Sequence, residues 1–343
     1  MINEPMSEYY NKINTWKSNE STFQTNMDEN FNSFNCSECD NNPSNPYQSC
    51  PTPSASKKLC DQSLGYDTGV SIDINVYESN ISKTKGDLVD YVTIEDGVIY
   101  NMIPGEIYYW ESKDDSDVYG YVKANGERRI INTSVRNVRD LGGLSVDVDN
   151  DGTIDGSLKY GKIFRGAKLS SSSVDVDNLS KLGIDEEIDL RGSSSDAKFS
   201  AYAPRQIVNY QVDKENFEAN YNALRSALVS TMQDVIDGKD VYFHCAIGTD
   251  RTGTLAYFLE GLLGVPEEER LQDYELSYFY GLLNRHRFYS TQPGSSITKR
   301  FTYMHNLYPT NEDIYNYFMQ GSTNTTKDEK LIQDFRNAMI NNN

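Results

Sequence analysis

The chain has 343 residues, enough for about two domains, and carries 51 acidic side chains against 32 lysines and arginines. The resulting net charge of −19 excludes a broad nucleic-acid interface and disfavours docking on an anionic membrane surface. No apolar run reaches the length of about 18 residues that a bilayer crossing needs, so no membrane span is expected.

The N-terminal segment, residues 1–65, is rich in Asn, Ser, Asp and Glu, and we expect it to be rich in loops. It holds four of the five cysteines of the chain: Cys36, Cys39, Cys50 and Cys60. Their irregular spacing leaves open two disulfides, a zinc site or free thiols. The start of the chain lacks the pattern of a secretory signal. We therefore expect a cytoplasmic protein or, if a signal has been removed, an extracellular or cell-surface one.

Residues 66–132 contain short runs that alternate apolar and polar side chains, which predicts a small antiparallel β module. The strand candidates are 70–77, 91–94, 106–111 and 119–123. A Pro-Gly turn at Pro104 precedes an aromatic strand, and this pattern is similar to fibronectin type III modules. The alternative is a β extension of the domain that follows.

From residue 133 to residue 343, predicted strands alternate with predicted helices, which indicates an α/β domain. Apolar side chains recur every three or four residues from Phe217 to Val235, ahead of Gly238, and again from Leu255 to Leu263. This spacing predicts two amphipathic helices. The strand candidates are 187–190, 207–210 and 241–243.

The fifth cysteine, Cys245, lies between the last of these strands and the helix that follows it. In a strand–loop–helix arrangement the backbone N–H groups of a tight loop point inward and hold an anion at the helix N-terminus. The same donors stabilise a thiolate, and Arg251 can bind two phosphate oxygens at once. The loop therefore predicts covalent catalysis through phosphocysteine. The alternative is a buried cysteine that only packs.

The segment 244–253, His-Cys-Ala-Ile-Gly-Thr-Asp-Arg-Thr-Gly, resembles the signature of the bacterial tyrosine/lipid phosphatases in the protein-tyrosine-phosphatase superfamily. Further segments resemble other blocks of that family in the same order: 137–143, 160–166, 182–184, 188–191 and 273–277. The resemblance implies a central sheet flanked by helices, after the small β module. It also implies hydrolysis of phosphate monoesters without a required cofactor, the substrate being a phosphorylated protein or a small phosphate ester.

The resemblance implies a role for each residue of the loop. Cys245 would be the nucleophile, Arg251 the phosphate clamp and Asp250 the general acid. Other members of the superfamily use an aspartate on a mobile loop, for which Asp213 is the candidate here, although Asp213 is also typical of a helix N-cap. The remaining substrate-binding candidates are Ala246, Ile247, Gly248, Thr249, Thr252 and Gly253.

Five further residues are expected to support the loop: His244, Arg139, Asp140, Asp189 and Arg191. His244 precedes the nucleophile and would orient the loop. Asp140 and Arg191 are expected to pair below the pocket, and a purely structural ion pair is the alternative.

One position departs from the family pattern. Thr249 stands where many members carry lysine, whose charge would suit polyanionic inositol phosphates. We therefore expect phosphotyrosine-type monoesters as substrates, with phosphoinositides or inositol phosphates as the alternative. A sulfurtransferase, an arsenate reductase and a non-catalytic phosphate-binding module are the remaining options. Asp250 beside Arg251 argues against the first two of these, and the intact Cys245 and Arg251 argue against the third.

A second motif lies between Leu144 and Lys159. Its acidic residues stand at the first, third, fifth and ninth positions of a calcium-loop pattern: Asp147, Asp149, Asp151 and Asp155. Gly152 fits the sixth position, but Leu158 stands where the pattern needs an acid at the twelfth. A structural calcium ion is one expectation, and an acidic hairpin is the other. The three histidines have no paired metal-ligand spacing, so no catalytic metal is expected.

Overall fold

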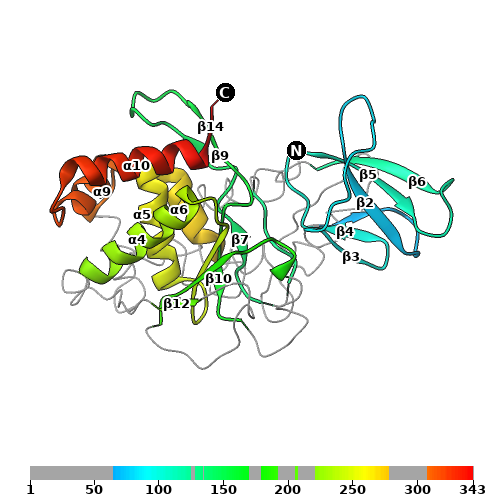
Figure 1. Cartoon of the computed structure of the whole chain (residues 1–343), viewed down its shortest axis with the longest axis horizontal. Helices are drawn as coiled ribbons and strands as arrows, with labels where there is room; N and C mark the ends of the chain where they lie inside the picture. The colour runs from blue at the N-terminus through cyan, green and yellow to red at the C-terminus, as the bar shows by residue number, and fades with distance from the viewer. Residues whose placement is uncertain are drawn as a thin grey trace, which may run out of the picture. The chain divides into compact units, whose positions relative to one another are not determined.

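The computed structural model describes residues 65–124, 128–133, 135–169, 179–191, 205–207, 221–277 and 307–342 (Figure 1). The four N-terminal cysteines, Asp213 and the predicted helix start at Phe217 lie outside the described residues. The chain divides into two compact units at the junction of Asn132 and Thr133. The separate N-terminal segment and the fibronectin-like character of the β module stay predictions.

Within its described residues, the first unit contains six strands in two antiparallel sheets. The strands are β1 Tyr66–Asp67, β2 Ile74–Ser79, β3 Thr93–Glu95, β4 Val98–Tyr100, β5 Ile107–Ser112 and β6 Tyr119–Lys123. The sheet orders are β1-β4-β3 and β2-β5-β6. Strand β6 matches the prediction in full, and β5 is displaced from it by one residue.

Strand β2 begins later than its alternating pattern predicts, at Ile74 in place of residue 70. The reason is a local turn: the Thr68 N–H donates to the Gly97 carbonyl at 3.1 Å, and a Cβ added at Gly97 would lie 1.8 Å from the Val70 carbonyl oxygen. Residues near Val70 thus pack on the β3–β4 turn, and the chain begins to pair with β5 only at Ile74.

The second unit is built on a five-stranded sheet with the order β12-β11-β13-β10-β7. Its strands are β7 Arg139–Asp140, β10 Ile163–Ala167, β11 Glu186–Asp189, β12 Arg205–Ile207 and β13 Val241–Cys245. All neighbours are parallel except β7, which pairs antiparallel with β10 at the edge. The predicted α/β class is confirmed, and β13 is its central strand.

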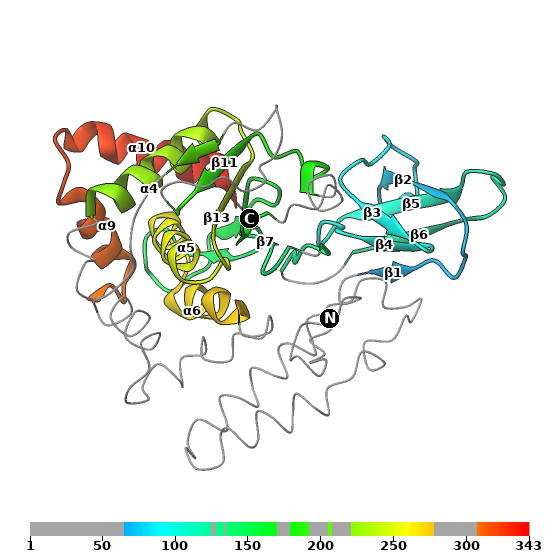
Figure 2. The ribbon, with the colours of Figure 1, turned by 90° about the horizontal axis from the view of Figure 1, so that it is seen from below.

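Two helices pack against this sheet, α4 Tyr221–Ile236 and α5 Asp250–Leu263. Three further helices pack on these two: α6 Glu267–Glu275, α9 Asn311–Met319 and α10 Thr325–Met339. Helices α4, α5 and α10 lie against one another (Figures 1 and 2). A small sheet of β8 Ser145–Val146, β9 Gly156–Leu158 and β14 Ile340–Asn342 joins the end of the described chain to this unit. Among the helices of the described ranges, none is long and apolar enough to cross a membrane.

The direction of each side chain on β13 decides the geometry of the site. All five residues of this strand are buried. Val241, Phe243 and Cys245 belong to the hydrophobic core that α4 and α5 also line. Because successive side chains of a strand point to opposite faces, Tyr242 and His244 lie on the other face of the sheet. The thiol therefore lies on the helix side, at the carboxyl end of the central strand.

Candidate active site

The loop that follows β13 leads directly into α5. Cys245 ends the strand and Asp250 begins the helix, so the phosphoryl-binding candidates lie at the helix N-terminus. Gly248 has a φ of 72°, which favours glycine. A Cβ at this position would also lie 2.4 Å from the Gly166 carbonyl carbon on β10, so the loop can pass there only with glycine.

The Cys245 thiol is reduced and buried, at 3% exposure. Burial raises its pKa, but hydrogen bonds from Thr252 and from the Ile247 backbone, together with the Arg251 charge, outweigh burial and hold the pKa below that of an ordinary cysteine. The Thr252 hydroxyl is itself buried and has no oxygen or nitrogen partner within the described residues, so it remains for the thiolate. This environment favours a nucleophilic sulfur.

Asp250 and Arg251 lie side by side in the first turn of α5, both half-buried. The Arg251 Nη1 donates to the Leu190 carbonyl at 3.1 Å, which ties the clamp candidate to the end of β11. The Tyr274 hydroxyl donates to Asp250 Oδ1 at 3.2 Å. Tyr274 also packs on Gly253, where a Cβ would lie 2.6 Å from its ring. Helix α6 thus positions the acid candidate.

A buried ion cluster that the sequence did not predict lies behind the loop. The Asp273 carboxylate on α6 accepts hydrogen bonds from Arg139 Nε at 2.9 Å and from Arg165 Nη1, and the three side chains are at most 1% exposed. Burial and the neighbouring Arg139 lower the pKa of Arg165 to about 10. Arg165 therefore still carries its charge at neutral pH, and the Asp273 carboxylate forms a buried salt bridge with each of the two arginines.

This cluster also contacts the loop that follows β13. The Gly248 carbonyl accepts hydrogen bonds from Arg165 Nη2 at 3.2 Å and from Asn137 Nδ2 at 2.8 Å. Asn137, in turn, donates to the Ser277 hydroxyl at 2.9 Å and accepts from Arg139 Nη1. Asp273 therefore positions both arginines. Arg165 donates directly to the Gly248 carbonyl, and Arg139 is connected to that carbonyl through Asn137.

The supporting aspartates make other contacts than expected. The two carboxylate oxygens of Asp140 accept from the Gly142 and Gly161 N–H groups, at 2.8 and 2.7 Å. Arg191 pairs with Asp189 through two hydrogen bonds, of 2.9 and 2.8 Å. The expected pairing of Asp140 with Arg191 is thus replaced by a local pair at the end of β11, because Asp140 is used to join two turns.

The Asp189 carboxylate is strongly held in its ionised form. Burial raises the pKa of Asp189, but the hydrogen bonds from Arg191 and the nearby His244 lower it by a larger amount. The resulting pKa is about 2. His244 is fully buried, and its Nε2 lies 2.8 Å from Oε1 of Glu187, a residue that sequence reasoning missed. Glu187 gave one signal in the sequence, its place as the first residue of the predicted strand 187–190.

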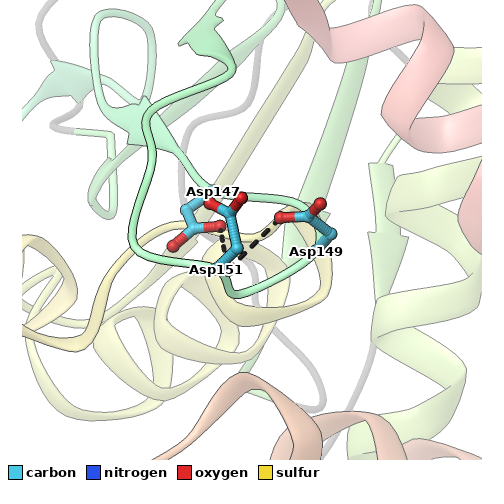
Figure 3. Close-up of side chains that lie close together, drawn as sticks. All are labelled: Asp147, Asp149 and Asp151. Carbon is cyan, nitrogen blue, oxygen red and sulfur yellow. Dashed lines mark hydrogen bonds between the residues drawn. The ribbon is translucent and has the colours of Figure 1, made fainter.

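The acidic motif forms the hairpin between β8 and β9. Asp147, Asp149 and Asp151 bring one carboxylate oxygen each within 4.8 Å of one another (Figure 3). Asp155, the fourth expected ligand, accepts instead from the Val148 N–H at 2.8 Å. The hairpin alternative is present in the fold, and calcium binding by the three grouped aspartates stays a prediction.

Calcium should raise the unfolding midpoint of the wild-type protein, and Asp149→Asn should remove most of that shift. At about 100 times the Kd, a ligand of the folded state adds about 2.7 kcal/mol to its stability. Asp149 is exposed, so the variant should fold normally. Thermal unfolding with calcium, with magnesium and with chelator measures this. Identical midpoints with calcium and with chelator would identify the motif as a plain hairpin.

Comparison with known proteins finds similarity to tyrosine phosphatases. A family model described as "Tyrosine phosphatase family" matches residues 131–328. A Cupriavidus necator protein, H16_A0669, which its name gives as a candidate tyrosine-protein phosphatase, is 27% identical over 172 residues. That match covers 41% of this chain and 60% of the relative, so the chain spans less than two thirds of the relative's length.

Two solved structures are also similar to parts of the chain. A cysteine-to-serine variant of the P. aeruginosa protein TpbA, in complex with pTyr, is 18% identical with a TM-score of 0.32, covering 43% of this chain and 90% of TpbA. The core catalytic domain of the PP-IP phosphatase SIW14 from S. cerevisiae, in complex with citrate, is 16% identical with a TM-score of 0.30, covering 45% and 94%. Since the family model matches more than half of its residues, the chain belongs to the tyrosine phosphatase family.

Proposed function

We propose that the chain hydrolyses phosphate monoesters, with phosphotyrosine in proteins or peptides as the preferred substrate, through a phosphocysteine on Cys245. The observation that carries this proposal is the Cys245 thiol, whose pKa is lowered where the central strand meets the N-terminus of α5. The family description and the name of the C. necator relative support tyrosine phosphate as the substrate class.

The proposed reaction has two steps. The Cys245 thiolate attacks phosphorus, the bond between phosphorus and the leaving oxygen breaks, and Asp250 gives its proton to that oxygen. Water then attacks the phosphocysteine and passes a proton to Asp250, the S–P bond breaks, and inorganic phosphate and the thiolate are released. Arg251 and the loop N–H groups stabilise the charge on the phosphoryl oxygens in both steps.

Asp250→Asn should slow the first step about 10²- to 10⁴-fold for substrates with a poor leaving group. A leaving group as acidic as p-nitrophenol departs without a proton, so its ester should lose less. Single-turnover rates with phenyl phosphate and p-nitrophenyl phosphate measure this difference. Tyr274→Phe is the matched control, because it removes the hydrogen bond to Asp250 and keeps the acid. If Asp213→Asn produced this selective loss and Asp250→Asn did not, Asp213 would be the acid.

The environment of Thr249 supports a monoester over a polyanionic substrate. Its side chain is fully buried, and its hydroxyl donates to the Ile247 carbonyl at 3.3 Å. Thr249 therefore adds no positive charge to the pocket, whereas a lysine at this position would. Substrates with several phosphate groups thus lack one electrostatic attraction. Single phosphates bound by the loop and Arg251 are favoured.

A substrate panel tests the proposed function. We expect the highest kcat/KM for phosphotyrosine peptides, with lower values for phosphoserine peptides, phosphoinositides and inositol hexakisphosphate. A preference for either inositol class would overturn the substrate assignment. Absence of turnover with every substrate, together with retained phosphate binding, would replace the enzyme by a phosphate-binding module.

A further inference from the structure

A buried contact between a histidine and a glutamate lies directly behind the proposed nucleophile, on the face of the sheet opposite the thiol. His244 precedes Cys245 on β13, and Glu187 lies on the adjacent parallel strand β11. His244 Nε2 is 2.8 Å from Glu187 Oε1, and both side chains are fully buried. Burying an ionised carboxylate is costly unless it is paired, and His244 is a hydrogen-bond partner of Glu187.

Each nitrogen of the imidazole faces an oxygen atom. Its Nδ1 lies 3.3 Å from the Cys245 carbonyl oxygen, which can only accept, so Nδ1 carries a proton. Its Nε2 faces the Glu187 carboxylate, which also accepts when ionised. Both ring nitrogens of His244 thus face oxygen atoms, and a doubly protonated imidazole could donate to both.

The other groups around His244 are an ion pair, a tyrosine ring and a glycine. Asp189 is paired with Arg191 at 2.8 Å on β11, and its lowered pKa owes part of the shift to His244. The Tyr242 ring stacks beside the imidazole at 5.5 Å, and its hydroxyl donates to the Ala167 carbonyl. On the β10 side the residue in register with His244 is Gly166, which has no side chain. Among the described residues, Glu187 is thus the carboxylate with a hydrogen bond to the ring.

We propose that Glu187 is a positioning residue that keeps His244 doubly protonated, so that an imidazolium charge behind Cys245 favours the thiolate. The inference rests on the proposed role of Cys245 as nucleophile. Glu187 acts only through His244, since its carboxylate lies on the face of the sheet away from the thiol. The His244–Glu187 pair would be neutral as a whole. Its positive member, His244, directly precedes Cys245 in the chain, so the pair should lower the pKa of the thiol.

Glu187→Gln tests the proposal with little change of shape. The amide preserves size and can accept a hydrogen bond, but it does not compensate a buried imidazolium, so His244 should become neutral. We expect the pH midpoint of Cys245 alkylation by iodoacetamide to rise by about one unit. Below that midpoint, alkylation should then slow about tenfold. The acidic limb of kcat/KM should move by the same amount while KM changes little.

Glu186→Gln is the matched control, because this neighbouring carboxylate pairs with Lys239 at 3.1 Å. We expect the control to keep the wild-type alkylation profile even if its stability falls. A Glu187→Gln profile that coincides with that of the wild type, or that moves to lower pH, would overturn the proposal. A merely structural pair would lower the unfolding midpoint and leave the alkylation profile in place.

The wild-type protein supplies a second readout that depends on neither the variant's folding nor activity. The chain has three histidines, so ¹⁵N ring resonances of His244 can be assigned with His286→Asn and His305→Asn variants. We expect both His244 nitrogens to be protonated at neutral pH, and a neutral ring would overturn the proposal. If the protein hydrolysed no phosphate ester but His244 were doubly protonated, the proposed function would be wrong and the proposed role of Glu187 toward His244 would be retained.

Discussion

Replacing Cys245 by serine should abolish the hydrolysis of phosphotyrosine and leave the fold intact. Serine is nearly the same size as cysteine, but its hydroxyl does not ionise near neutral pH, so the donors that stabilise a thiolate have no anion to act on. Loss of a nucleophile in covalent catalysis typically lowers kcat by about 10⁴-fold or more. Initial rates with a phosphotyrosine peptide, measured beside the wild type, give the size of the loss.

The binding of substrate separates this result from misfolding. Arg251 and the loop N–H groups remain in Cys245→Ser, so the variant should bind the phosphotyrosine peptide without turning it over. Calorimetric titration and the unfolding midpoint provide that control. Wild-type rates in the folded variant would show that Cys245 is not the nucleophile.

Asp273→Asn should have the second largest effect, on stability as well as activity. The substitution leaves Arg139 and Arg165 buried without their counterion, and breaking a buried ion pair in this way costs about 3–5 kcal/mol. The Gly248 carbonyl depends on the same cluster, so kcat/KM should fall even where the variant is folded. Urea unfolding and steady-state kinetics at low temperature measure the two effects.

The matched control for Asp273 is Asp334→Asn on α10. Asp334 pairs with Lys330 at the surface, where the two side chains are 37% and 72% exposed, and water screens such a pair. We expect its unfolding curve to coincide with that of the wild type. If Asp273→Asn also unfolded like the wild type and retained full activity, the buried cluster would not be what supports the loop.

The strand–loop–helix arrangement around Cys245 was predictable from the sequence because its residues are close together in the chain. Cys245, Gly248, Asp250 and Arg251 lie within seven residues of one another, between an apolar strand and an amphipathic helix. Strand–loop–helix geometry follows from that order, and the position of the thiol at a helix N-terminus follows from the geometry. Which aspartate is the general acid could not be decided in this way, because it depends on the distance to a bound substrate.

The support behind the loop could not be predicted, because it joins residues far apart in the chain. Asp273 is separated by 134 residues from Arg139 and by 108 from Arg165, and no local pattern encodes such pairs. The same holds for Glu187 and His244, which adjacent parallel strands bring together. The family resemblance marked the segments that carry several of these residues, and only the fold gives their contacts.

Some secondary-structure elements have clear signals in the sequence. The start of α9 has a capping box formed by Thr310 and Asp313, and Ile332, Phe335 and Met339 follow helical spacing on the buried face of α10. Strands of two residues, such as β7 and β8, are too short to show any periodicity. In the acidic hairpin three of the four expected ligands are grouped, and the fourth, Asp155, accepts a hydrogen bond from the Val148 N–H.

The central claim is that the phosphoryl group passes through Cys245, and trapping the intermediate tests it most directly. The protein is mixed rapidly with a phosphotyrosine peptide, quenched in acid, digested and analysed by peptide mass spectrometry. We expect a phosphoryl group on the peptide that contains Cys245, formed within the first turnover and absent from Cys245→Ser. Continued turnover with phosphate on another residue, or on none, would contradict the mechanism.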